Sequence, residues 1–384
     1  MRRSNSRLLT ALVASMPLSG CGVGNSAPAQ AAPPQAQGAT TVTETNCGGP
    51  GGGRGDSASV VAAVLAFRDS LPATLRAKLE HPLTRATAIG WSNLPIGIVP
   101  RAGVRLGDLD STQNAAARRL VAAAVSACGL RMFDEVRLAD QDLSAVDVRG
   151  IGWGAGNYYI SILGSPSEQT PWMLQVGGHH LAYNLTFNGR EAGATPLFFG
   201  TEPLRFTADG IEHEPLRAQS AAMSALASAV AGHPEAHLSG TFTDVVKGVV
   251  LSFPPGKPPV GGTDTGYPQS YPQGTLDRGI LYGALTSAEQ QRVRVALESY
   301  ASLPGESLTR KLIDAYEAPG ALAATYVGYA GATDLGTRGA YVRIDGPRIW
   351  MEFVVQPGIA NPEKVHYHAL WRDKTSDYGG EARQ

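Results

Sequence analysis

Two segments far apart in the chain share one strand–turn–strand pattern. Residues 159–164 read as a strand, a turn containing proline follows, and the chain continues in a strand that begins at Trp172. Residues 341–346 are likewise followed by a proline turn and a strand that begins at Trp350, and methionine comes next in both cases. Each pattern predicts an antiparallel hairpin. A chain with two such hairpins needs an antiparallel sheet to hold them.

Helical patterns precede both hairpins in the same order. Residues 57–71, 111–128 and 287–303 carry apolar side chains at helical spacing. The segments just before the last two, 103–109 and 279–285, align without a gap on two glycines and a leucine. The chain also has 46 glycines and 26 prolines in 384 residues, which favours many tight connections over a helical bundle.

These patterns together predict an α+β fold. We expect two pseudo-repeated halves, each a group of helices with a β-hairpin, packed into one compact unit with an antiparallel sheet. The halves cover about 57–240 and 270–384, within a globular domain over 57–384, and a segment rich in proline and glycine joins them.

The first residues have the features of a secretion signal. Three arginines lie within the first seven residues, and a short apolar run follows over 8–18. Residues 18–21, Leu-Ser-Gly-Cys, resemble the lipobox of bacterial lipoproteins. We therefore expect a signal peptide over 1–20 and a lipid on Cys21 that anchors the protein to a membrane in the bacterial cell envelope, outside the cytoplasm. The alternative is an ordinary secreted protein.

Residues 21–56 are predicted to be a flexible tether, because they have too few large apolar side chains to form a core. The tether contains Cys47, and Cys128 lies at the end of a predicted helix. In an oxidising compartment, Cys47 and Cys128 can form a disulfide. The alternative is that Cys47 is a free thiol and Cys128 a small buried side chain.

Histidine placement is the strongest chemical signal. Four of the eight histidines follow the two Trp-Met strands: His179, His180, His366 and His368. On a strand, His366 and His368 point to one side, about 7 Å apart along the chain, so both imidazoles can reach one metal ion. If their segment is extended, His179 and His180 point oppositely, so at most one of them is expected to join. This predicts a divalent metal site, for zinc or copper; the alternatives are a catalytic site without metal, or structural histidines.

Two carboxylates are candidates to act beside these histidines. Glu352 is on the strand preceding His366, and Glu202 stands in a loop framed by glycine and proline after the first histidine pair. Either can serve as an acid/base group of an active site. A plain turn residue is the alternative for Glu202.

The end of the chain concentrates charged and aromatic residues. Arg372 is a candidate to clamp an anionic substrate, and Asp373 or Asp377 is a candidate to orient a metal-bound histidine. Tyr378 follows directly and is counted with this group. The alternative is an internal Arg–Asp bridge that pins the C-terminus.

The charge balance and the absence of common motifs exclude several functions. Lys and Arg number 32 and Asp and Glu 33, a formal net charge of −1, so a nucleic-acid partner is not expected. The sequence contains no GxSxG, HExxH, P-loop or Rossmann fingerprint.

Six motifs in order give a family resemblance: WSNLP, GVRLGDL, YYISILGSPS, PWMLQVGGHHL, FFGTEP and HYHALWRDKTSDYG. With them the chain resembles a bacterial secreted family catalogued as domain of unknown function 3500 (DUF3500), over nearly everything after about residue 57. The resemblance implies no established activity. The residues that it carries over lie within these motifs, namely His179, His180, Glu202, His366, His368, Arg372, Asp377 and Tyr378.

The leading hypothesis is an extracytoplasmic, lipid-anchored, metal-dependent hydrolase that acts on a small-molecule substrate. The second is a non-catalytic metal-binding lipoprotein for copper or zinc. The third is an envelope ligand-binding domain whose groove is lined by the tryptophans Trp91, Trp153, Trp172, Trp350 and Trp371.

Overall fold

The computed structural model divides the chain into two units, Met1–Ala39 and Thr40–Gln384, and all described residues belong to the second. The signal peptide, Cys21, Cys47, most of the tether and most of the connection between the halves lie outside the described residues. The described ranges are 53–147, 150–188, 191–245, 271–272 and 274–383.

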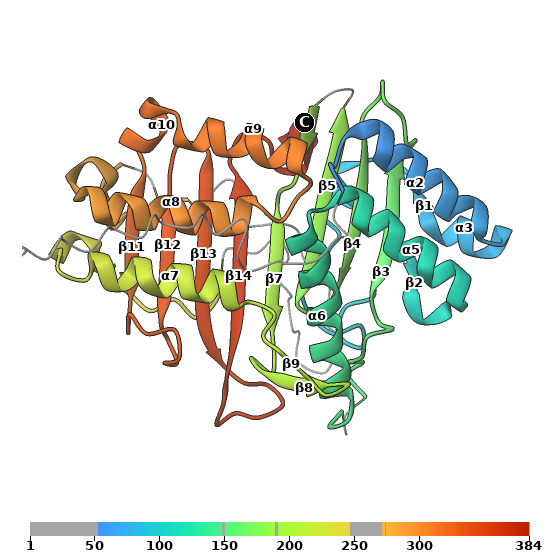
Figure 1. Ribbon diagram of the computed structural model, residues 1–384, viewed down its shortest axis with the longest axis horizontal. Helices are drawn as coiled ribbons and strands as arrows, with labels where there is room; N and C mark the ends of the chain where they lie inside the picture. The colour runs from blue at the N-terminus through green and yellow to red at the C-terminus, as the bar shows by residue number, and fades with distance from the viewer. Residues whose placement is uncertain (1–52, 148–149, 189–190, 246–270, 273, 384) are drawn as a thin grey trace, which may run out of the picture. The chain divides into compact units, whose positions relative to one another are not determined.

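A single twisted sheet forms the centre of the folded unit (Figure 1). Its main path runs β1-β3-β4-β5-β7-β14-β13-β12-β11-β10, antiparallel except for the β1–β3 pair, with β2 beside β3 and β6 beside β5. The strands are β1 (Glu80–His81), β2 (Val104–Arg105), β3 (Tyr159–Gly164), β4 (Trp172–Gly178), β5 (Leu181–Asn188), β6 (Glu191–Gly193), β7 (Leu197–Thr201), β10 (Ile280–Leu281), β11 (Tyr326–Ala330), β12 (Tyr341–Asp345), β13 (Ile349–Pro357) and β14 (Val365–Asp373), while β8 (Phe206–Ala208) and β9 (Ile211–His213) pair separately.

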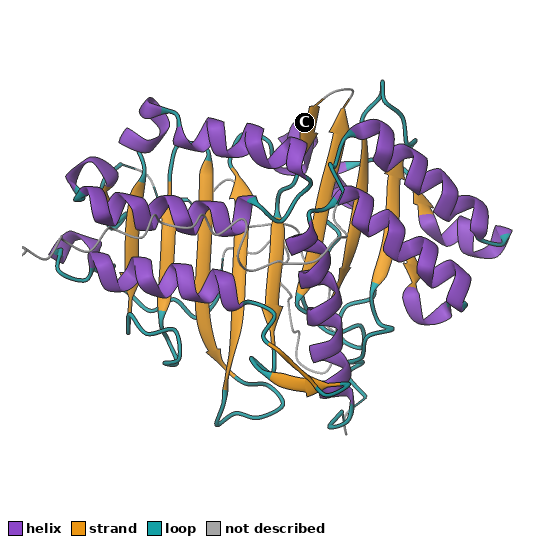
Figure 2. Ribbon diagram, viewed as in Figure 1, coloured by secondary structure: helices purple, strands orange, loops and turns teal. Residues whose placement is uncertain are grey.

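The longer helices cover one face of this sheet (Figures 1 and 2). α2, α5 and α6 lie over β3–β5, and α7, α8 and α9 lie over β11–β14. Within the described residues, no helix is both long and apolar enough to cross a membrane. The helices are α2 (Ser57–Ser70), α3 (Ala73–Leu79), α4 (Arg85–Ala88), α5 (Ser111–Ala124), α6 (Ala127–Ser144), α7 (Arg217–Val230), α8 (Ser287–Ala301), α9 (Glu306–Glu317) and α10 (Pro319–Ala323), with 3₁₀ turns η1 (Leu106–Asp108), η2 (Pro234–Ala236), η3 (Tyr282–Ala284) and η4 (Asp377–Arg383).

The fold is α+β and both predicted hairpins are confirmed. β3 pairs with β4 so that Gly164 faces Trp172, and β12 pairs with β13 so that Asp345 faces Trp350. Between the two groups lies β7, which pairs with β5 on one side and β14 on the other. The third strands of the two groups therefore flank one central strand.

Side-chain caps fix where the helices begin. Asp110 opens α5 and Thr286 opens α8, each with a reciprocal capping box. The predicted single helix over 111–128 is wrong, because the chain breaks at Val125 and Ser126 caps a new helix, α6. Cys128 therefore lies in the first turn of α6. It is disulfide-bonded, and its pairing with Cys47 stays a prediction.

The two segments that align in the sequence also match in structure. Gly103 and Gly279 have φ angles of 110° and 105°, and a Cβ would meet a carbonyl oxygen at 2.5 Å in the first and 2.0 Å in the second. Each precedes a short strand, a 3₁₀ turn and a capped helix. The halves differ in that β2 pairs directly with β3, whereas β11 separates β10 from β12. Internal duplication stays a prediction.

The two faces of the sheet carry separate cores. The larger core joins the helices to residues such as Ile162, Leu174 and Tyr183, and the smaller core covers the other face with loops around Trp91 and the C-terminal turn. Side chains alternate between the two faces along β14. Ala369 and Trp371 join the helix-side core, and His366 and His368, at the alternate positions, therefore face the side without long helices.

The tryptophans do not line one groove, contrary to the third hypothesis. Trp172 and Trp371 belong to the helix-side core, and Trp91 belongs to the core of the opposite face. All five are buried, and Trp350 packs against Tyr271 while Trp153 packs beside His179.

Candidate metal centre

Three histidines from distant parts of the chain converge on the face without long helices. His180, His366 and His368 each offer a nitrogen, and these three atoms lie within 4.8 Å of one another. The Nε2 atoms of His366 and His368 are 3.2 Å apart. A tetrahedral zinc with nitrogen ligands at 2.0–2.1 Å separates two nitrogens by about 3.3–3.4 Å, so this pair is spaced for a shared ion.

The sheet topology produces this convergence. His366 and His368 lie on β14, and His180 lies in the two-residue turn between β4 and β5. The imidazole of His180 is 5.4 Å from that of His366 and 5.2 Å from that of His368, centroid to centroid. All three residues are buried, with 2–4% of their surface exposed.

Gly200 on β7 provides the space between the two histidine segments. It lies opposite His368 in the strand register, and its N–H donates to the carbonyl oxygen of His180 at 2.7 Å. A Cβ at this position would lie 3.0 Å from Cδ2 of His180 and 3.1 Å from Cδ2 of His368. A larger residue would therefore push the two rings apart.

Hydrogen bonds to the far nitrogens orient two of the rings. Nδ1 of His366 bonds to the carbonyl oxygen of Pro357 at 2.7 Å, and Nδ1 of His368 bonds to Oδ1 of Asp244 at 3.0 Å. Partners of this kind fix a metal-binding imidazole with its other nitrogen toward the ion. The predicted orienting groups, Asp373 and Asp377, do not fill this role: both are hydrogen-bonded within the C-terminal segment.

The electrostatics favour a neutral imidazole at His366. Burial, and then the neighbouring His368, lower the pKa of His366, so that this imidazole is neutral at neutral pH. Neutral imidazole is the form that coordinates a metal ion.

His179 does not join the cluster, although its ring stacks on that of His180 at 3.7 Å. Its Nδ1 lies 2.6 Å from Oδ1 of Asp140, and both residues are buried. At most one of the two histidines is expected at the site, on the assumption that their segment is extended, and that assumption is wrong. The pair forms a turn, not an extended strand, and His180 has a φ of 61°.

Both candidate acid/base carboxylates are held by other groups. Glu202 accepts hydrogen bonds from the backbone N–H groups of Ile359 at 2.9 Å and Ala360 at 2.9 Å, and so it holds the loop between β13 and β14. Glu352 accepts a hydrogen bond from the Tyr341 hydroxyl at 2.6 Å. Glu202 is close enough for its charge to raise the pKa of His366.

The C-terminal residues form an internal network. Arg372 donates to Asp377 across 2.9 Å, and neither side chain is exposed to solvent. Burial raises the pKa of Asp377 to about 6, against the opposing effect of Arg372. The hydroxyl of Tyr378 accepts a hydrogen bond from the Trp91 indole at 2.8 Å. The structure thus contains the bridge that the sequence left open as the alternative to an anion clamp.

Sequence reasoning missed three contributors to the site. Asp244 is 124 positions from the histidine that it orients, and nothing in its sequence context marks it. Asp140 lies on α6 among other acidic residues, without a signal for its contact with His179. Gly200 had a signal, because it stands in the FFGTEP motif, but its role depends on the register of β7.

The fold and site together define an α+β protein with a buried cluster of three imidazoles. A family model described as protein of unknown function (DUF3500) matches residues 54–380, so the chain belongs to this family. Comparison with curated proteins and with solved structures finds no match.

Proposed function

We propose that this DUF3500 protein binds a divalent transition metal, zinc or copper, through His180, His366 and His368. The observation that carries the proposal is the convergence of three donor nitrogens within 4.8 Å. The rings of His366 and His368 are each oriented by a hydrogen bond to Nδ1, and the three proposed ligands include no carboxylate. Imidazole-only donors suit zinc and copper better than magnesium or calcium, which prefer oxygen.

The sharpest test is the metal content of the purified full chain. We expect about one zinc or copper ion per chain by elemental analysis, lost in a His366→Ala/His368→Ala double variant. His237→Ala is the matched control, because it removes an exposed histidine outside the cluster. Equal metal content in the wild type and the double variant would refute the site.

Hydrolysis is a second candidate function, favoured by the number of ligands. Three protein ligands leave a fourth position open, and a zinc so held can lower the pKa of a bound water to about 7. Because Glu202 and Glu352 are engaged elsewhere, neither is assigned as the general base. Turnover of nitrophenyl esters and phosphoesters that requires added metal and disappears in the double variant would support this function. A metal-loaded protein without turnover would leave the non-catalytic metal-binding role.

The same protein is proposed to be exported and attached to the bacterial cell envelope by a lipid on Cys21. The lipobox-like sequence supports this, as does the disulfide of Cys128, since disulfides persist in oxidising compartments. Metabolic labelling with a fatty acid, compared between the wild type and Cys21→Ser, tests the anchor. Equal labelling of both would refute it.

A further inference from the structure

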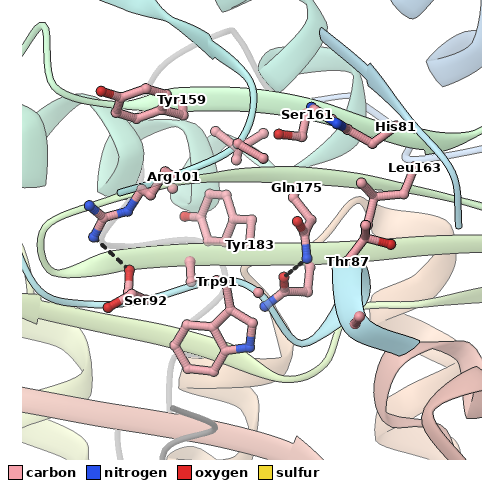
Figure 3. Close-up of a pocket in the computed structure, with 17 residues that line it drawn as sticks. His81, Thr87, Trp91, Ser92, Arg101, Tyr159, Ser161, Leu163, Gln175 and Tyr183 are labelled. Atoms are coloured by element: carbon pink, nitrogen blue, oxygen red, sulfur yellow. Dashed lines mark hydrogen bonds between the residues drawn. The ribbon is translucent and has the colours of Figure 1, made fainter. Parts of the chain in front are cut away.

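A cavity of about 220 Å³ lies over β3, β4 and β5, on the face without long helices (Figure 3). The segment that runs from α4 to Ala102 forms its opposite wall. Among the lining residues are Trp91, Ser161, Gln175 and Arg101. The volume is below the range of about 300–1,000 Å³ typical of drug-sized ligands, so the cavity suits a smaller molecule.

Arg101 places a positive charge at this cavity, and its hydrogen bonds within the described residues go to neutral oxygens. Its guanidinium donates to the carbonyl oxygens of Ser92 at 2.8 Å, of Leu94 and of Val99 at 3.4 Å, and it forms no ion pair with a described residue. Its Nε is buried without a hydrogen-bond partner in that part of the chain. Burial lowers the pKa of Arg101 to about 10, against the opposing effect of groups that include Asp140, and the side chain stays charged at neutral pH. A partly buried guanidinium that is bonded only to neutral oxygens keeps an N–H free to form a charge-assisted bond with an anion.

Two neutral polar groups line the same cavity with hydrogen-bonding capacity to spare. Gln175 uses its Nε2 to donate to Ala88 O at 2.7 Å and to Asn184 Oδ1 at 3.0 Å, and its Oε1 bonds to no described residue. The hydroxyl of Ser161 forms no hydrogen bond within the described residues either. In Figure 3 these two side chains lie between Arg101 and His81. They can recognise hydroxyl groups of a ligand.

Trp91 gives the cavity a rigid aromatic wall. Its indole N–H is held by the Tyr378 hydroxyl at 2.8 Å, and its ring packs against Phe198 at 6.1 Å. An aromatic face beside hydrogen-bonding groups suits a ligand that has both an apolar face and polar edges.

We propose that this cavity binds a small hydroxy-carboxylate of about the size of one sugar ring. The carboxylate pairs with Arg101, the hydroxyl groups bond to Ser161 and Gln175, and the carbon skeleton lies against Trp91. This site uses none of the three clustered histidines, so it stands independently of the proposed metal centre.

Calorimetric titration of the full chain with D-galacturonate tests the proposal, with D-galactose as its uncharged counterpart. We expect saturable binding of galacturonate, with galactose weaker by about tenfold or more because it lacks the charge-assisted bond. Arg101→Met is expected to weaken galacturonate binding by about tenfold or more. Arg217→Met, which removes an exposed arginine with 71% side-chain accessibility, is the control and should bind as the wild type does.

Two further variants keep the test decisive. Arg101→Met also loosens the loop that Arg101 holds. Ser161→Ala is therefore a second, independent variant, because it removes only a hydroxyl that bonds to no described residue. It is expected to weaken galacturonate binding by about three- to tenfold. The His366→Ala/His368→Ala variant should bind galacturonate normally. The proposal is overturned by no saturable binding, by equal binding of the two sugars, by normal binding in both cavity variants, or by loss of binding in the histidine variant.

Discussion

Replacing Gly200 with alanine should separate the rings of the proposed metal centre. The new Cβ would lie 2.6 Å from the carbonyl oxygen of Tyr367 and 3.0–3.1 Å from ring carbons of His180 and His368. Carbon atoms in contact are normally about 3.5–4.0 Å apart, so the rings must move by about 0.5–1 Å. The metal–ligand distances of a genuine site lie within about 0.2 Å of their standard values, so a movement of this size takes a ring out of coordination range. We expect the affinity for zinc to fall by about 100-fold or more.

The affinity is measured by competition of the metal-free protein with a chromophoric zinc chelator. Urea unfolding in parallel should show a loss of about 1–3 kcal/mol from overpacking, which leaves the protein folded. Gly283→Ala is the matched control, because a Cβ there meets nothing within 4 Å. If Gly200→Ala bound zinc with an affinity within about threefold of that of the wild type, zinc binding would not depend on the close approach of His180 and His368 beside Gly200.

Three other substitutions test the surroundings of the site. Asp244→Ala should weaken zinc binding by about 10–100-fold through loss of the orienting bond to His368, and unchanged affinity would remove Asp244 from the site. Arg372→Met should cost about 3–5 kcal/mol in urea unfolding at pH 7, because it leaves Asp377 buried and unpaired; a loss below about 1 kcal/mol would refute a structural bridge. Asp377→Asn tests the raised pKa of about 6. Between about pH 4 and 6 the folded wild type keeps a proton that the unfolded chain has lost, so wild-type stability falls as pH rises. Relative to the wild type, Asp377→Asn should therefore gain up to about 3 kcal/mol from pH 4 to 7, and a relative loss would contradict that pKa.

Local signals in the sequence were enough for the hairpins and for the facing of His366 and His368. The proline turns and the Trp-Met starts define the strands, and strand alternation places both imidazoles on one side. These features depend on neighbouring residues, which the sequence displays directly.

The remaining features depend on contacts between distant segments. That His180 joins the cluster while His179 turns to Asp140 follows from a two-residue turn with a positive φ, and His-His carries no turn signal. The role of Asp244 requires a loop far along the chain to reach β14. Burial decides the roles of Arg372 and Asp377, because two charged groups without solvent must satisfy each other.

Crystals of the zinc-loaded protein, measured on both sides of the zinc absorption edge, locate the ion directly. We predict one anomalous difference peak about 2.0–2.1 Å from a nitrogen of each of His180, His366 and His368. A protein that holds its zinc elsewhere, or shows no peak between these three imidazoles, would contradict the account.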